Sequence, residues 1–102
     1  ITPLIVRKEA KGHGTQAYIE GPVLPEKSNV VILEDVVTTG QSAMKAIVRL
    51  RDAGYTVNQV ISLVDRQQGG AEYYAQAQID FKAVYKISEI QTRWRELQAL
   101  SI

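Results

Sequence analysis

Residues 29–42 decide the fold, and they read NVVILEDVVTTGQS. The run Val30–Leu33 is apolar and rich in β-branched side chains, which predicts a strand buried on both faces. Two carboxylates follow, then a Thr-Thr-Gly turn, and Gln41 opens a segment with helical periodicity. A strand that runs into a small-residue turn and a helix start is an arrangement with which α/β proteins bind phosphate.

The polar side chains of this stretch suit a phosphorylated sugar. Gly40 allows a ligand to approach the backbone closely. Three hydroxyl side chains add donors: Thr38, Thr39 and Ser42. Acids beside a phosphate would repel it, so Glu34 and Asp35 make sense if they accept hydrogen bonds from ribose hydroxyls and stabilise positive charge on the ring. The alternatives are an ordinary nucleotide-type turn and a solvated acidic pair at a strand end.

The composition bounds the class of protein. The chain has 102 residues, enough for one small domain, with 45% apolar and 23% charged residues. A net charge of +1 implies no bulk attraction to nucleic acid or membrane surfaces, and we expect neither as a partner. The absence of cysteine fits a reducing compartment, and we expect the cytoplasm. The chain starts with Ile1, almost directly in a strand, which suggests a piece of a longer protein.

Periodicity and turn residues predict the remaining elements. We expect strands at Pro3–Lys8, Tyr18–Glu20, Thr56–Asp65 and Phe81–Tyr85, helices at Gln41–Ala53 and Ala71–Gln78, and a last helix opened by a capping box at Ser88–Gln91. The strand–helix–strand order predicts a right-handed crossover into a parallel sheet. In the last helix an apolar stripe that contains Trp94 predicts a core-facing side, with Trp94 in the core.

The residues with candidate catalytic or binding roles lie at the ends of predicted strands. Arg7-Lys8, Glu34-Asp35 and Arg66 each follow a predicted strand. Because open parallel sheets bind their ligands at the carboxyl ends of their strands, we expect these side chains to converge.

A cluster of cations follows the first predicted strand. Arg7, Lys8, Lys11 and His13 lie within seven residues of a loop that also holds two glycines. The simple interpretation is a solvated charged loop. Beside a pyrophosphate-bearing substrate, mobile cations could instead close over the leaving group and stabilise its charge.

Arg66 follows the strand expected beside the central one. A surface ion pair with Asp65 is the simple interpretation. The alternative is recognition of a planar substrate carboxylate by the bidentate guanidinium.

The stretch Val30–Ser42 resembles the phosphoribosyl-pyrophosphate (PRPP) signature of the type I phosphoribosyltransferases. That resemblance implies PRPP binding by the residues that match it: Glu34, Asp35, Val36, Val37, Thr38, Thr39, Gly40, Gln41 and Ser42. One mild departure is Glu34, where an Asp is often seen, and it changes the reach of the side chain without changing its charge.

Two further motifs resemble the orotate phosphoribosyltransferases: Arg-Lys-x-x-Lys-x-His-Gly from Arg7, and Val-Asp-Arg-Gln-x-Gly-Gly from Val64. The resemblance implies that Arg7, Lys8, Lys11 and His13 contact pyrophosphate, and that Thr38 and Arg66 hold orotate. It also implies catalytic roles for Lys11, His13 and Asp35, and a homodimer in which the cationic loop reaches into the neighbouring site.

The resemblance implies an α/β type I phosphoribosyltransferase fold with a mainly parallel sheet flanked by helices. Residues 1–102 would form the C-terminal part of a single domain, because nothing here matches the family's N-terminal hood or its first pyrophosphate-binding strand. The implied reaction makes orotidine 5′-monophosphate and pyrophosphate from orotate and PRPP in de novo pyrimidine synthesis. Mg²⁺ would be held by substrate oxygens and water rather than by protein ligands. The alternatives are transfer to another base, and a non-catalytic PRPP-sensing regulator.

Overall fold

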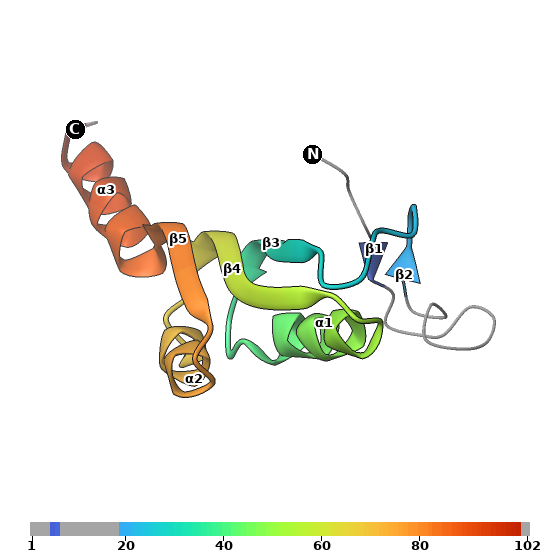
Figure 1. Cartoon of the computed structure of the whole chain (residues 1–102). Helices are drawn as coiled ribbons and strands as arrows, with labels where there is room; N and C mark the ends of the chain where they lie inside the picture. The colour runs from blue at the N-terminus through green and yellow to red at the C-terminus, as the bar shows by residue number, and fades with distance from the viewer. Residues whose placement is uncertain (1–4, 7–18, 101–102) are drawn as a thin grey trace.

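The computed structural model describes residues 5–6 and 19–100 of the chain. Its elements, in chain order, are β1 (Ile5–Val6), β2 (Ile19–Glu20), β3 (Asn29–Val37), α1 (Gln41–Asp52), β4 (Thr56–Asp65), α2 (Gly70–Gln76), β5 (Asp80–Lys86) and α3 (Ile87–Leu100). Figure 1 shows α1 and α2 beneath the strands and α3 extending away from them. The molecule is accordingly elongated, with extents of 58 × 26 × 24 Å.

The central sheet is parallel, and its strand order β3-β4-β5 follows the order of the chain. Asn29 pairs with Thr56 in the first ladder, and Gln59 pairs with Asp80 in the second. Two consecutive strand–helix–strand units therefore build the sheet, which confirms the predicted α/β class and the mainly parallel sheet.

The first two strands form a separate antiparallel pair, in which Ile5 lies opposite Glu20. The first strand therefore lies outside the parallel sheet. The cations expected at its end, Arg7 and Lys8, are not among the described residues, so their convergence with the ends of β3 and β4 stays a prediction. Ile5 in this strand is exposed.

Two glycines bound α1. Gly40 precedes it and Gly54 follows it, and both have positive φ angles (90° and 96°) that glycine adopts without strain. After the helix, the N–H of Tyr55 donates to the carbonyl of Leu50 at 3.1 Å, which satisfies an exposed helix end. The predicted bounds of α1 were therefore right to within one residue, and those of β4 were right.

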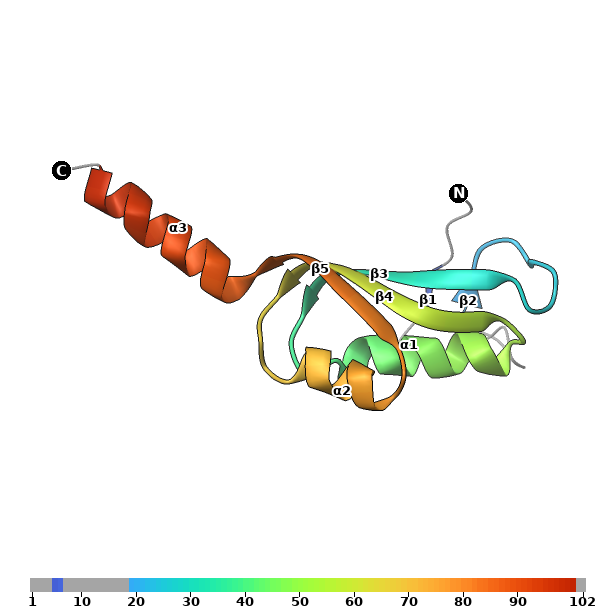
Figure 2. The ribbon, with the colours of Figure 1, turned by 60° about the vertical axis from the view of Figure 1, so that its left-hand side comes forward.

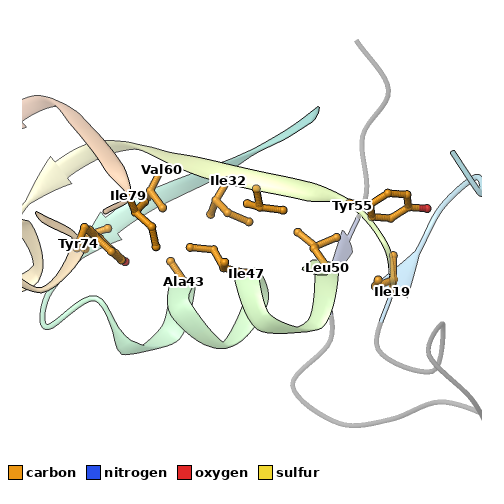
Figure 3. Close-up of a cluster of buried hydrophobic side chains, with 11 residues drawn as sticks. Ile19, Ile32, Ala43, Ile47, Leu50, Tyr55, Val60, Tyr74 and Ile79 are labelled. Atoms are coloured by element: carbon orange, nitrogen blue, oxygen red, sulfur yellow. The ribbon is translucent and has the colours of Figure 1, made fainter. Parts of the chain in front are cut away.

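The core lies between the sheet and one layer of helices. Ala43, Ile47 and Leu50 of α1 are buried against the strands, and Tyr74 of α2 extends this layer toward β5. Figure 3 shows these side chains meeting Ile32, Val60 and Ile79 in one cluster.

The opposite face of the sheet carries no helix within the described part of the chain (Figure 2). Three of its large apolar side chains are exposed, with exposed fractions of 74% for Leu33, 52% for Leu63 and 58% for Val84. The prediction that the central strand is buried on both faces is therefore wrong for this chain. We call this surface the bare sheet face, and we define it by Leu33, Leu63 and Val84.

Within the described part of the chain, helix α3 contacts mainly β5 and is otherwise uncovered. None of its residues is buried, and Trp94 is 62% exposed. The prediction that Trp94 lies in the core is wrong here. The predicted capping box is also displaced, because the carboxylate of Glu89 accepts the N–H of Lys86 at 3.3 Å, whereas the N–H of Ser88 donates to the side chain of Gln67 at 3.0 Å.

Candidate functional site

The turn Thr38–Gly40 joins the carboxyl end of β3 to the start of α1. Gly40 stands at the position before the helix, and no side chain caps the first turn of α1 among the described residues. That first turn also contains no acidic residue. Because the first N–H groups of a helix have no intrahelical partners, this end of α1 offers donors and a positive dipole to an anion. The structure thus places Thr38, Thr39, Gly40, Gln41 and Ser42 where the sequence predicts a phosphate site.

The two acids lie at the end of β3 but in different environments. Glu34 is half-buried on the side of the sheet that carries the helices, whereas Asp35 is exposed. Burial and the nearby charge of Asp35 raise the pKa of Glu34 above its ordinary value. An Oδ1 atom of Asp35 accepts the N–H of Val36 at 2.8 Å. Their assignment to ribose hydroxyls stays a prediction, and it requires that a ligand reach both environments at the strand end.

Arg66 lies directly beside the turn Thr38–Gly40, which we call the phosphate turn. Its N–H donates to the carbonyl of Val37 at 2.9 Å, which joins the ends of β4 and β3. The guanidinium is exposed, and no ion pair with Asp65 is present in the part of the chain that the structure describes. Asp65 is buried and accepts the N–H of Gln67 at 2.8 Å instead. The surface-pair interpretation is therefore wrong, and Arg66 is available to a ligand.

The structure also brings together the two residues assigned to orotate. Val37, which bonds to Arg66, is followed by Thr38, whose carbonyl accepts the N–H of Gly70 at 3.1 Å. The phosphate turn and the loop Arg66–Gly70 therefore lie side by side at the carboxyl edge of the sheet. This edge is where parallel α/β sheets bind ligands.

The four residues of the cationic loop lie outside the described residues: Arg7, Lys8, Lys11 and His13. Their contacts with pyrophosphate stay a prediction. The described residues contain no group of three or more His, Cys, Asp or Glu side chains arranged around a common metal site. Among the described helices, none is long and apolar enough to cross a bilayer.

Two residues that contact the turn or the strand end before it were not predicted from the sequence. Tyr74 is fully buried, and its hydroxyl donates to the carbonyl of Gly40 at 2.9 Å. Gly70 packs so closely that a Cβ there would lie 2.7 Å from Cγ1 of Val37. The Gly69-Gly70 pair was a usable signal, because adjacent glycines before a helix often mark close backbone contact. Tyr74 carried no such signal, since a buried tyrosine in a helix reads as an ordinary core residue.

The fold and the site together define a class of protein. A parallel strand–helix–strand unit, an uncapped helix start after a Thr-Thr-Gly turn, and acids at the same strand end are typical of enzymes that bind sugar phosphates. The family model described as uracil phosphoribosyltransferase matches residues 2–89. The chain therefore belongs to the phosphoribosyltransferase family that this model describes.

The individual relatives with similar sequences are orotate phosphoribosyltransferases. The chain is 68% identical over 97 residues to the orotate phosphoribosyltransferase of Nostoc sp., a match that covers 95% of this chain and 47% of that protein. The corresponding protein of Synechocystis sp. is 60% identical over 96 residues, with 94% and 48% covered. The chain thus spans about half the length of these relatives.

Solved structures agree with the sequence relatives. The UMP synthase of Leishmania donovani matches with a TM-score of 0.80 and 35% identity, covering 94% of this chain and 20% of that one. The orotate phosphoribosyltransferase of Mycobacterium tuberculosis in complex with PRPP matches with a TM-score of 0.71 and 32% identity, covering 86% and 49%. These neighbours confirm the phosphoribosyltransferase fold.

Proposed function

We propose that this chain is the C-terminal part of an orotate phosphoribosyltransferase, which makes orotidine 5′-monophosphate and pyrophosphate from PRPP and orotate. The observation that carries the proposal is the hydrogen bond between the N–H of Arg66 and the carbonyl of Val37, which fixes the backbone of an exposed arginine beside an uncapped phosphate turn. The 68% identity to the Nostoc enzyme supports the same assignment.

The phosphate turn binds the 5′-phosphate of PRPP. The N–H groups at the start of α1 and the hydroxyls of Thr38, Thr39 and Ser42 supply donors, and no acid in the first turn opposes the charge. Asp35 and Glu34 accept hydrogen bonds from the ribose hydroxyls. Their negative charge also favours the positive charge that grows on the ring as the bond at C1′ breaks.

Transfer replaces one bond at C1′ of the ribose with another. The bond from C1′ to the pyrophosphate oxygen breaks, the bond from C1′ to N1 of orotate forms, and the N1 proton is released. The cationic loop stabilises the leaving pyrophosphate, with Lys11 and His13 as its catalytic residues and Arg7 and Lys8 as further contacts. Mg²⁺ would be held by pyrophosphate oxygens and water, because this ion keeps several of its waters and binds readily to phosphate oxygens. When bound, the ion neutralises the charge of the pyrophosphate.

Arg66 and Thr38 recognise the base. A guanidinium binds a carboxylate through two parallel hydrogen bonds, and orotate carries such a carboxylate. The backbone of the loop that holds Arg66 is hydrogen-bonded to the phosphate turn and to the strand end before it. The base and the phosphate would therefore be bound by two segments that are fixed relative to each other.

The bare sheet face supports the proposal that a further part of the same domain completes the fold. Side chains such as Leu33, at 74% exposure, are rarely left in a continuous apolar sheet face of a soluble protein. The complete enzyme would act in the cytoplasm in de novo pyrimidine synthesis, as a homodimer in which the cationic loop serves the neighbouring site.

One observation favours a second candidate, uracil phosphoribosyltransferase, because the matching family model carries that description. Uracil resembles orotate but lacks the carboxylate, so it would give Arg66 no anionic partner. The exposed guanidinium beside the turn therefore favours orotate.

The test uses a reconstituted protein, which we define as this chain joined to the part of the Nostoc relative that it does not match. We expect this protein to convert orotate and PRPP to orotidine 5′-monophosphate, measured by chromatography, and to use uracil poorly. Efficient turnover of uracil with no turnover of orotate would favour the second candidate. No turnover of either base by a folded reconstituted protein would contradict the proposal.

A further inference from the structure

The phosphate turn is held from below by the neighbouring strand end and helix. Two of its carbonyls and the one that precedes it accept hydrogen bonds from residues 66–74: Val37 from the N–H of Arg66 at 2.9 Å, Thr38 from the N–H of Gly70 at 3.1 Å, and Gly40 from the hydroxyl of Tyr74 at 2.9 Å. The first two bonds join backbone to backbone. The third is made by a side chain, and it fixes the residue that precedes α1.

Tyr74 is built into this position. It is fully buried, and its ring lies 5.2 Å from the ring of Phe81 on β5, between centroids. Figure 3 shows it at the end of the core cluster that lies closest to the start of α1. Burial and the nearby charges of Glu34 and Tyr73 raise the pKa of Tyr74 to about 12, so the hydroxyl keeps its proton and remains a donor at neutral pH.

Gly40 packs against both tyrosines of α2, so the turn leaves little room for a side chain there. With φ at 90°, a Cβ on residue 40 would lie 3.0 Å from Cζ of Tyr74, 3.2 Å from its hydroxyl oxygen and 3.0 Å from Cδ2 of Tyr73. The carbonyl of Gly40 also accepts the N–H of Met44 at 3.1 Å, which is the first hydrogen bond of α1. Tyr74 therefore orients the same peptide group from which the anion-binding end of the helix begins.

We propose that Tyr74 is a positioning residue for the 5′-phosphate of PRPP, which acts by holding the carbonyl of Gly40 and thereby aiming the N–H groups at the start of α1. This inference rests on the proposed function, because it assumes that the turn binds the phosphate of a phosphoribosyl substrate. Tyr74 itself does not touch the substrate in this proposal, because the phosphate turn lies between its side chain and the bound phosphate.

The test compares Tyr74→Phe with Tyr73→Phe in the reconstituted protein. The first change removes only the hydroxyl that bonds to Gly40. The second removes the hydroxyl of the adjacent tyrosine, which makes no hydrogen bond within residues 19–100. Binding of ribose 5-phosphate is measured by calorimetry, together with the KM values for PRPP and orotate and the unfolding temperature.

We expect Tyr74→Phe to weaken ribose 5-phosphate binding and to raise the KM for PRPP by about five- to tenfold, the loss of one hydrogen bond. The KM for orotate and the Tyr73→Phe variant should stay at the wild-type values. A Tyr74→Phe protein that unfolds at a lower temperature but binds ribose 5-phosphate normally would overturn the positioning role. A wild-type reconstituted protein that binds no ribose 5-phosphate would instead overturn the proposed function itself.

Discussion

At the scale of single residues, the proposed function assigns the choice of base to Arg66. Its side chain is exposed, and its backbone is fixed to Val37, so the guanidinium starts from a defined place beside the phosphate turn. A carboxylate bound there would lose a charge-assisted hydrogen bond if the guanidinium were removed. The phosphate turn itself would keep all of its donors.

We therefore expect Arg66→Ala in the reconstituted protein to raise the KM for orotate on the order of ten- to a hundredfold, with little change in the KM for PRPP. Arg66→Lys should fall between, because an ammonium keeps the charge and loses the bidentate geometry. Gln68→Ala, an exposed change in the same loop, is the matched control. Equal increases in both KM values would assign Arg66 a structural role.

Glu34 makes a prediction about pH. Its pKa is raised in the folded protein by burial and by Asp35, so the folded state binds this proton more tightly than the unfolded state does. Stability is then lost as the pH rises from the ordinary value of 4.5 through the raised value. We expect Glu34→Gln to unfold at a higher temperature than the wild type at pH 7, and the two to converge below pH 4.5.

The control for this prediction is Glu26→Gln, which removes an exposed carboxylate from the turn before β3. It should change the unfolding temperature far less at either pH. If Glu34→Gln were no more stable than the wild type at pH 7, burial of a charged carboxylate would not be a cost of this site. The Gln variant should also bind PRPP less well, a cost in function for a gain in stability.

At the scale of elements, the sequence predicted β3, α1 and β4 well because each carries its own local signals. β-branched runs, a helix-start glycine and a helix-end glycine act within a few residues of where they stand. The exposure of Leu33 and Trp94 could not be predicted in this way. Periodicity indicates that a residue belongs to an apolar face of its strand or helix. It does not indicate whether the element that packs on that face lies in the same stretch of chain.

The site shows the same division. Candidate phosphate donors and acids could be proposed because they stand in consecutive residues, from Glu34 to Ser42, and their roles stay predictions. The support of the turn by Tyr74 could not, because residues 40 and 74 meet only through the packing of α2 beside α1. Contacts between elements depend on three-dimensional placement, for which one sequence gives little information.

The role of the cationic loop is tested most directly by mixing two variants that are each impaired in a different part of the site. We expect Lys11→Ala to lower kcat with little loss of PRPP affinity, because its contact strengthens mainly as pyrophosphate leaves. Asp35→Asn should lower turnover about ten- to a hundredfold through the ribose. If loops cross a dimer, the mixed variants should regain activity, since one of the two sites in a heterodimer carries neither change.

Subunit exchange in that mixture is verified separately with differently tagged chains. Exchange without any recovery of activity would show that each loop serves its own subunit. Recovery in a mixture of Lys11→Ala with itself, under a different tag, would show that the gain is unrelated to complementation.

At the scale of the whole molecule, the bare sheet face dominates the behaviour of the chain in solution. Exposed apolar side chains of three parallel strands favour association with any surface that covers them. We expect residues 1–102 alone to self-associate at micromolar concentration in sedimentation experiments and to form no orotidine 5′-monophosphate. The reconstituted protein should sediment as one discrete species.

A substitution on that face separates this cause from others. Leu33→Glu should reduce the self-association, whereas Val23→Glu, at a comparably exposed position in the loop before β3, should not. A chain that is monomeric without any substitution, and that turns over orotate, would show that the bare sheet face needs no cover.

The strand order of the sheet also bears on how the protein reaches its fold. Each strand pairs with the next one along the chain, Asn29 with Thr56 and Gln59 with Asp80, so each ladder closes across one crossover helix. Parallel pairings of this kind bring together residues far apart along the chain, and they form slowly compared with contacts inside a helix or hairpin. We therefore expect the phosphate turn to take its final shape late in folding, only after β4 has paired with β3, because the N–H groups of Arg66 and Gly70 hold the carbonyls of Val37 and Thr38.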